Sequence, residues 1–467
     1  MNIDLVDSRR MQHTALRNRI LDGAWENDLR QYIGEYIDAA RSSSWGSPAQ
    51  EINTLVSVVT QISRIYDKRP NVSNVDESAN LSPLSPLFNL HQQHERYVLT
   101  DRESAIRIDW REASHLGPGG LSVRLVTPEH LVIDDIPTAP GVPAIIKERR
   151  KRTHPETKRV GVYWDVWDIS DPSAPSYRIV SDESGLDCSP DFLGEAAREP
   201  YRYVTESGAP FLPWVLYHAK PTGRVWDPYT WSELVHATLA MGLYGTFFKH
   251  AIKDGSWVQK YGINLALKGA GTAGVGDNRR TSVSTDPASI LMFTQDGNEA
   301  ASLGSFPLPV DPDKLITSIQ HYQRMVNDSL GIDQWQSEGP GNVSGVAIRL
   351  QRDTVRRLSE ANMPQFKLGD IELLEKGARI YNLFSDRPNG PLPVSGYAIS
   401  YNGVPPSVEE QTTELDRDLK MIQIGLKSPV DIVLKANPDM DRATALQYLL
   451  TIKAEKAVID AVNIPPQ

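Results

Sequence analysis

The feature that most constrains this chain is a stretch over residues 229–257 in which apolar side chains fall on nearly every side of a helix. A helix that is apolar all round must be covered on most of its faces. Its most apolar part, residues 234–248, is shorter than the roughly 20 residues that a membrane span needs and contains His236. The pattern therefore predicts a helix that is central in the fold or packed against neighbouring subunits, and not a membrane span.

Composition narrows the possible functions. The 467 residues are enough for about two to four structural regions, and 40% hydrophobic with 23% charged residues is typical of a globular protein. The net charge of −10 disfavours tight, non-specific binding of DNA over the whole surface, because phosphates are bound by basic faces. A single cysteine, Cys188, excludes a disulfide or a Cys-based metal site within one chain and fits a reducing cytoplasm. The charged residues 1–10 lack the apolar core of a signal peptide.

The first half of the chain reads as an α+β region. Apolar periodicity predicts a helix from Thr14 to about residue 37 and a second over residues 52–66 that Pro70 ends. Alternating apolar and polar residues then predict strands near residues 106–111 and 121–125. A hairpin follows, with one arm ending at residue 151, a tip at 153–156 and a second arm over 160–169.

The second half is mainly helical. Asp311 caps a helix whose first residue is Pro312, and a loop over residues 333–345 follows it. Ser344 then caps a long helix, in which Pro364 is expected to cause a kink or a break. After one strand at 397–401, the capping box at Ser407 begins a purely helical C-terminal part.

Three glycines, Gly269, Gly271 and Gly274, match the spacing of a dinucleotide-binding motif. That site needs a helix N-terminus directly after the glycines, to face the pyrophosphate. The Ser/Thr/Asp-rich residues that follow signal no helix, so a flexible loop is favoured over a nucleotide site.

Two other clusters have a structural and a chemical interpretation. His91, His94 and Glu95 could begin a metal site, but no third ligand has a suitable spacing, and a solvated helix face is favoured. A basic cluster flanks the predicted hairpin tip. It could contact nucleic acid or an acidic partner, but no aromatic residues are interleaved, so a solvated hairpin tip is favoured. The cluster contains Lys147, Arg149, Arg150, Lys151, Arg152, Lys158 and Arg159.

We find no Walker A, G-x-S-x-G, H-E-x-x-H, EF-hand or paired-carboxylate motif. We therefore expect no enzymatic activity, no catalytic residues, no cofactor and no metal.

The order of elements, together with short motifs, resembles the portal proteins of tailed bacteriophages over most of the chain. These are ring-shaped oligomers, usually of twelve subunits, at one vertex of the capsid. Residues 342–347, Asn-Val-Ser-Gly-Val-Ala, are similar to the Ser-Gly-x-Ala segment that opens the long kinked helix of the family. Residues 208–211, Gly-Ala-Pro-Phe, with Leu216 and Tyr217, are similar to the stretch that leads into its first stem helix.

The resemblance implies an α+β ring subunit with an α/β wing, a two-helix stem, a small β-containing clip, a long kinked helix and an all-helical crown. It implies these parts: wing 1–228, first stem helix 229–257, clip 258–310, second stem helix 311–332, tunnel loop 333–345, long kinked wing helix 346–384, wing strand return 385–405 and helical crown 406–467.

The resemblance also implies the function: a homo-oligomeric channel through which double-stranded DNA is packaged and ejected. Its implied partners are the terminase large subunit, the head-tail adaptor, and the major capsid or scaffolding protein, with no membrane. The implied location is the portal vertex of the virion, after assembly in the host cytoplasm. Ser344, Gly345 and Pro364 would mark the loop–helix junction and kink, and the channel-facing residues would be Gln334, Gln336, Ser337, Glu338 and Asn342.

Charge fits that role, because residues 333–345 contain Asp333 and Glu338 but no Lys or Arg, and a loop beside moving DNA should not trap phosphates. Two alternatives stay open. One is another phage connector or tail structural protein, which particle symmetry would distinguish. The other is a nucleotide-binding enzyme that uses residues 269–274, which equilibrium binding of NAD or ATP would test.

Overall fold

The protein is α+β, as predicted. The computed structural model describes residues 5–36, 47–76, 79–112, 119–136, 138–220, 223–225, 232–256, 260–263, 265–267, 293–295, 302–305, 311–329, 345–386, 390–402, 408–436 and 441–462. The chain divides into two compact units, Met1–Val404 and Pro405–Gln467. Among the described helices, none combines the length and the apolarity that a membrane span requires.

The chain begins with helices α1 (Leu5–Leu21) and α2 (Glu26–Tyr36), where the sequence pattern predicted a single helix from Thr14. That prediction is wrong because the chain turns at Gly23, whose φ of +78° favours glycine. Thr14 is buried inside α1 and caps nothing. Helix α4 (Thr54–Ile62) is capped by Asn53, whose side chain accepts a hydrogen bond from the Val56 amide, and it ends well before Pro70. Pro70 therefore does not end this helix.

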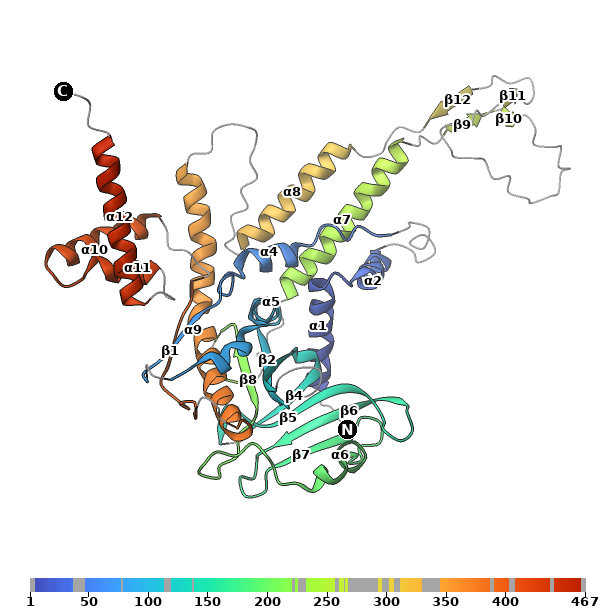
Figure 1. Cartoon of the computed structure of the whole chain (residues 1–467). Coiled ribbons are helices and arrows are strands. Elements are labelled where there is room, and N and C mark those ends of the chain that lie inside the picture. Colours follow the sequence, from blue (N-terminus) through green and yellow to red (C-terminus); the bar gives the residue numbers. More distant parts are fainter. Residues whose placement is uncertain are drawn as a thin grey trace, which may run out of the picture. The chain divides into compact units, whose positions relative to one another are not determined.

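The two largest described sheets of the larger unit are antiparallel (Figure 1). The three-stranded sheet has the order β3-β2-β8, with β2 (Glu103–Arg111), β3 (Gly120–Val126) and β8 (Trp214–His218). Its central strand β2 pairs Ile106 with both Leu125 and Val215. The four-stranded sheet has the order β4-β5-β6-β7, with β4 (Leu131–Ile136), β5 (Ala139–Thr153), β6 (Val160–Asp168) and β7 (Ser176–Ser181). The predicted hairpin is confirmed as β5–β6, with Thr153 opposite Val160.

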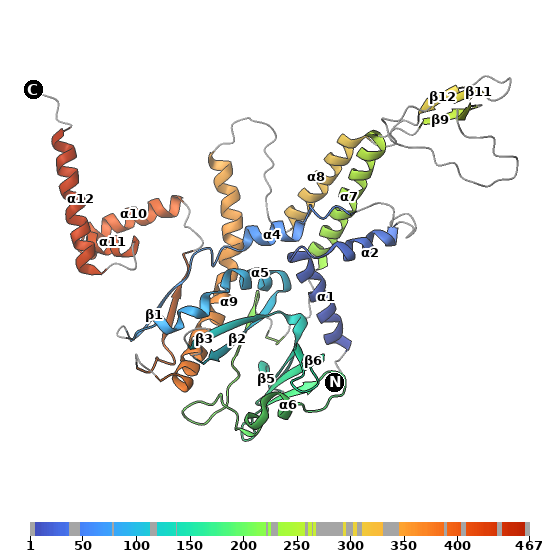
Figure 2. The ribbon, with the colours of Figure 1, turned by 45° about the vertical axis from the view of Figure 1, so that its right-hand side comes forward.

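Helix α7 (Ser232–Ser256) lies where the all-round apolar pattern predicted a helix. It runs antiparallel beside α8 (Pro312–Ser329), and both views show the pair side by side (Figures 1 and 2). The Asp311 carboxylate accepts a hydrogen bond from the Asp313 amide at 3.1 Å, as its capping role requires. Between the two helices, β9 (Lys260–Ile263) pairs with β12 (Ser302–Ser305), and β10 (Leu265–Leu267) pairs with β11 (Phe293–Gln295).

Helix α9 (Gly345–Phe384) is 40 residues long and includes Pro364. It continues through this proline, so the predicted break is excluded, and a bend there stays a prediction. Its C-terminal half packs on the three-stranded sheet and on the 3-10 helix η2 (Ser82–Phe88), in the largest apolar core. Strand β13 (Tyr397–Ser400) follows and pairs with β1 (Asn71–Asn74).

The shorter elements complete the larger unit: α5 (His91–Asp101), η3 (Pro128–His130), α6 (Ser189–Leu193) and η4 (Gly194–Arg198). In the smaller unit, the described elements are all helical, as predicted for residues from 406 onward. They are α10 (Val408–Gln423), α11 (Pro429–Ala436) and α12 (Arg442–Val462).

Candidate functional site

The residues predicted to face a channel fall outside the part of the chain that the structure describes. These are Gln334, Gln336, Ser337, Glu338 and Asn342, together with the predicted cap Ser344. The same holds for the motif glycines Gly269, Gly271 and Gly274. Gly345 is the first residue of α9, and Pro364 lies near its middle. The structure describes the helices on both sides of the predicted loop, α8 and α9, and the contacts that hold them in the fold.

Helix α7 is covered over its first half by helices of the same chain. Leu234, Leu239 and Leu243 pack in a core with residues of α1, α2 and α4. The close approach of α7 to α2 and α4 depends on two small residues of α7, Thr238 and Gly242, which lie four positions apart. A Cβ on Gly242 would lie 2.8 Å from Leu29, and the Thr238 hydroxyl accepts a hydrogen bond from the Leu55 amide at 3.0 Å. Neighbouring subunits are therefore not needed to bury this half.

The second half of α7 and the outer face of α8 are more open. The two helices meet through Tyr244 and Tyr322, whose ring centroids are 5.7 Å apart in an edge-on contact. Ile252 of α7 and Ile316 of α8 are exposed, and Met325 of α8 is 68% exposed. The pair thus presents large apolar side chains on a surface that no described residue covers.

Helix α9 is fixed to the rest of the unit through one buried carboxylate, that of Asp370. Its Oδ2 accepts hydrogen bonds from the hydroxyls of Tyr66 and Tyr401, both at 2.7 Å. Its Oδ1 accepts one from Tyr217 at 2.8 Å and lies 3.1 Å from Nε2 of His91. We call these five residues the Asp370 cluster. It joins α9 to α5, to β8 and to the segments after α4 and β13, so four separate parts of the chain hold the helix at one point.

Burial also fixes the protonation of the cluster's tyrosines. The pKa values of Tyr66, Tyr217 and Tyr401 are all raised, first by burial and then by the adjacent Asp370 carboxylate. The three phenols therefore keep their protons at neutral pH and act as hydrogen-bond donors to Asp370. A buried carboxylate with donors on both oxygens is well satisfied, which is the condition for keeping it in an apolar core.

Asp370 was not among the residues predicted from the sequence. Leu368, an apolar residue of the same helix, is 65% exposed. The buried face instead includes Phe366, Asp370 and Leu374, at four-residue spacing. An aspartate in register with apolar residues is the signal that could have identified Asp370 as a buried, partnered group.

The prediction that His91, His94 and Glu95 form a solvated helix face is wrong. All three are at most 1% exposed. Glu95 accepts hydrogen bonds from the backbone amides of Ile65 at 3.0 Å and Tyr66 at 3.3 Å, and burial raises its pKa to about 7. Within the described residues, no cluster of three His, Cys, Asp or Glu side chains could hold a metal ion. Glu95 thus serves as the acceptor for backbone amides of the turn that follows α4.

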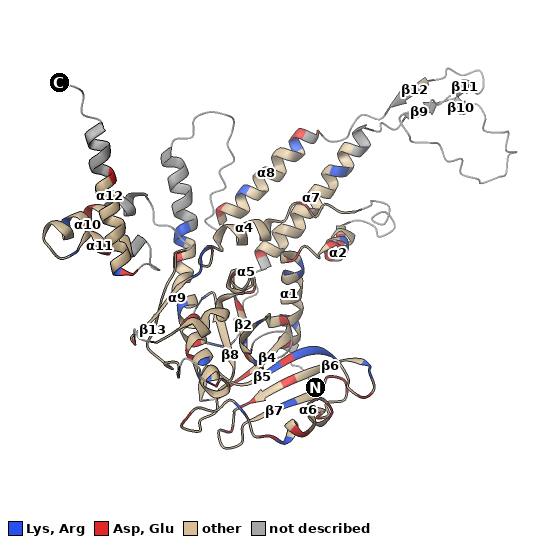
Figure 3. Cartoon of the chain, in the orientation of Figure 1, with Lys and Arg blue, Asp and Glu red and all other residues tan. Residues whose placement is uncertain are grey.

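The basic cluster lies along the β5–β6 hairpin, where Figure 3 shows Lys and Arg gathered. Several of its side chains form ion pairs within the sheet: Lys147 with Asp134 at 2.6 Å, Arg149 with Asp182 at 3.0 Å, and Arg150 and Arg152 with the fully buried Asp165. Lys151 is exposed on the strand, and Lys158 and Arg159 are exposed at the tip. The favoured interpretation, a solvated tip, holds for those two residues, whereas the paired members belong to the sheet.

Comparisons with known proteins leave the family of the chain open. No family model and no curated protein matches it. One solved structure that the comparison matches to this chain is described as "Virion of native gene transfer agent (GTA) particle", at 12% sequence identity. The alignment covers 82% of this chain and 89% of that chain, with a TM-score of 0.35. At this TM-score and identity, the likeness assigns no function.

Proposed function

We propose that this chain is a non-enzymatic portal subunit of a tailed bacteriophage, one of about twelve copies that close into a ring around a DNA channel. In this role it docks the terminase motor during packaging and the tail adaptor afterwards. ATP hydrolysis belongs to the motor, and this chain supplies the channel and the docking surfaces.

The observation that carries the proposal is the antiparallel pair α7–α8, joined through small two-stranded sheets and followed by the 40-residue helix α9. This order is what the resemblance implies for stem, clip and long wing helix. The separate helical unit Pro405–Gln467 begins next to the expected start of the crown at residue 406.

Surface character supports assembly into a ring. Ile252, Ile316 and Met325 are exposed on the helix pair, and large exposed apolar side chains on neighbouring helices are typical of subunit contacts. The net charge of −10 per chain makes a closed ring strongly negative, so DNA passes without being held by its phosphates.

Electron microscopy of the purified chain tests the proposal. We expect closed rings of about twelve subunits with a central hole. Met325→Glu, which puts a charge on the exposed face of α8, should reduce ring formation, whereas Lys158→Glu at the hairpin tip should not. A monodisperse monomer or an open filament at all concentrations would overturn the portal assignment and favour another connector or tail component. Micromolar binding of NAD or ATP that Gly271→Val abolishes would instead revive the enzyme alternative.

A further inference from the structure

The hairpin β5–β6 extends beyond strand β4, its neighbour in the four-stranded sheet. Leu131, the first residue of β4, pairs with Glu148, whereas residues 149–153 of β5 pair with β6. Before Leu131 the chain forms the 3-10 helix η3, so β4 does not continue alongside this part of β5. The outer part of β5 is therefore a sheet edge on the side of β4.

The hydrogen bonds of the hairpin show which backbone groups this edge leaves open. Neighbouring residues of an antiparallel strand direct their N–H and C=O groups to opposite sides. At the turn, the His154 amide donates to the Arg159 carbonyl at 2.9 Å, and the register of β5 with β6 has no shift. Even-numbered residues of β5 therefore face β6. Lys151 and Thr153 direct their N–H and C=O groups to the other side, where no described strand pairs with them.

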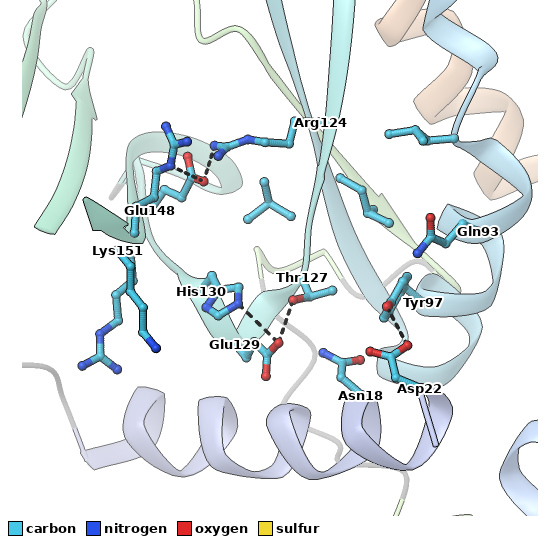
Figure 4. A pocket seen from close by; sticks show the side chains of 15 residues that line it. Asn18, Asp22, Gln93, Tyr97, Arg124, Thr127, Glu129, His130, Glu148 and Lys151 are labelled. Atoms are coloured by element: carbon cyan, nitrogen blue, oxygen red, sulfur yellow. Dashed lines mark hydrogen bonds and ion pairs between the residues drawn. The ribbon is translucent and has the colours of Figure 1, made fainter. Parts of the chain in front are cut away.

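Open space lies along this edge. A pocket of about 530 Å³ is lined by four consecutive residues of β5, from Glu148 to Lys151 (Figure 4). Consecutive side chains of a strand point to opposite faces of the sheet, so a cavity lined by all four lies beside the strand and not over one face. Glu129 and His130 of η3 line it as well. Beyond the pocket, Thr153 is exposed. An extended chain can therefore reach the open backbone groups.

The charges of the outer hairpin favour an acidic partner. Lys151, Lys158 and Arg159 are exposed, and none forms an ion pair with a described residue. Glu156 is the acid of the same turn, so the positive charges predominate there. A second copy of this edge would bring like charges together, which disfavours pairing of the two edges. An acidic side chain beside Lys151 is favoured for the same reason.

We propose that the open edge of β5 binds an extended acidic segment of a partner protein as an added strand. The main chain of the segment donates to and accepts from the backbone of Lys151 and Thr153, which is the source of affinity in strand addition. One of its carboxylates lies beside the Lys151 ammonium, and this contact gives the preference for an acidic sequence.

Fluorescence anisotropy tests this edge, with the full chain and a labelled peptide of alternating glutamate and threonine as the probe. We expect saturable binding of this peptide and binding about ten-fold weaker or less for the same peptide with lysine in place of glutamate. Methylation of those peptide amides that face β5 should abolish binding, because it blocks the hydrogen bonds and changes no charge.

Two substitutions at Thr153 form a matched pair. Thr153→Pro removes an amide that faces the open edge and leaves the hydrogen bonds to β6, which come from the even-numbered residues. It should abolish binding, whereas Thr153→Ala keeps the amide and should leave binding unchanged. Lys151→Ala should weaken the acidic peptide about ten-fold, the loss of one charge-assisted contact. Circular dichroism checks the fold of each variant, and the methylated peptide gives the same test on the unaltered chain.

Absence of saturable binding up to about 1 mM of the acidic peptide would overturn the proposal. Equal binding by Thr153→Pro and Thr153→Ala, or full binding of the methylated peptide, would also overturn it, because the contact would then rest on charge without strand pairing. Ring formation is a separate readout, so the outcome here does not depend on the portal assignment.

Discussion

The Tyr217 hydroxyl donates a 2.8 Å hydrogen bond to the Asp370 carboxylate and so joins strand β8 to helix α9 in the interior. Both side chains are at most 1% exposed. Because Tyr66, Tyr401 and His91 meet the same carboxylate, the position of α9 depends on one polar residue as well as on apolar packing. Such a contact fixes both the rotation and the register of a long helix, which apolar contacts alone define less sharply.

Loss of the Asp370 carboxylate should be costly. Asp370→Ala leaves three buried tyrosine hydroxyls without their acceptor, and we expect the free energy of unfolding to fall by about 3–5 kcal/mol. Tyr401→Phe removes one donor and leaves the carboxylate with its other partners, so it should cost only about 1 kcal/mol. Urea denaturation followed by tryptophan fluorescence measures both. Equal effects of the two variants would show that the cluster does not act through Asp370.

The Gly369→Ala substitution tests how tightly α9 packs on β8. A Cβ at residue 369 would lie 2.5 Å from the ring of Tyr217, which cannot move away without losing Asp370. We expect a loss of about 1–3 kcal/mol of unfolding free energy, the usual cost of overpacking a core. Gly34→Ala is the matched control, because α2 leaves open space around that position. It should stabilise the chain by up to about 1 kcal/mol through helix propensity. A neutral Gly369→Ala would mean that β8 and α9 are less closely packed than described.

The acid stability of the chain should depend on His94. Its pKa lies well below the ordinary value, because burial and then the adjacent His91 disfavour the charged ring. Below about pH 6.5 the unfolded chain therefore binds a proton that the folded chain does not, and stability is lost as the pH falls. Glu95 acts in the opposite sense: its pKa of about 7 makes the folded state less stable as the pH rises from about 4.5 to 7.

The variant His94→Phe separates the two effects, because Glu95 is present in both proteins and cancels in the difference. Phenylalanine keeps the edge-on ring contact with Tyr217, whose centroid lies 4.3 Å from that of His94. Between pH 7 and pH 5, the unfolding free energy of the original chain should fall by about 2 kcal/mol relative to the variant. Denaturation curves over this pH range provide the measurement. Parallel pH profiles would rule out a titrating role for His94.

The sequence pattern correctly predicted those elements that are determined by residues close together in the sequence. The β5–β6 hairpin follows from alternation and turn residues close in the sequence, and the start of α8 follows from Asp311 and Pro312. The helix through residue 23 was predicted wrongly because apolar spacing continues across Gly23, although the backbone turns there. In that case turn chemistry outweighed periodicity.

The partners of the buried polar residues were beyond such reasoning. Asp370 meets Tyr66 and His91 across 304 and 279 residues, and Glu95 binds amides about 30 residues away. The spacing along one helix can place an aspartate on the buried face, but it does not reveal which distant groups bind it. The channel-loop residues pose a different problem, since their proposed role requires a ring of copies.

Deletion of Gln334 to Asn342 tests that role directly. The deletion removes the segment between α8 and α9 and leaves the described faces of both helices intact. If the segment contacts DNA in a channel, rings should still assemble, and packaging or retention of DNA in particles should fall. Electron microscopy of the purified variant and a nuclease-protection assay on particles measure the two effects. Ile316 and Met325 lie on α8, outside the deletion. Met325→Glu should therefore reduce ring assembly itself, which the deletion should leave intact. Failure of the deletion variant to form rings would make the segment an assembly element and contradict its assignment as a channel loop.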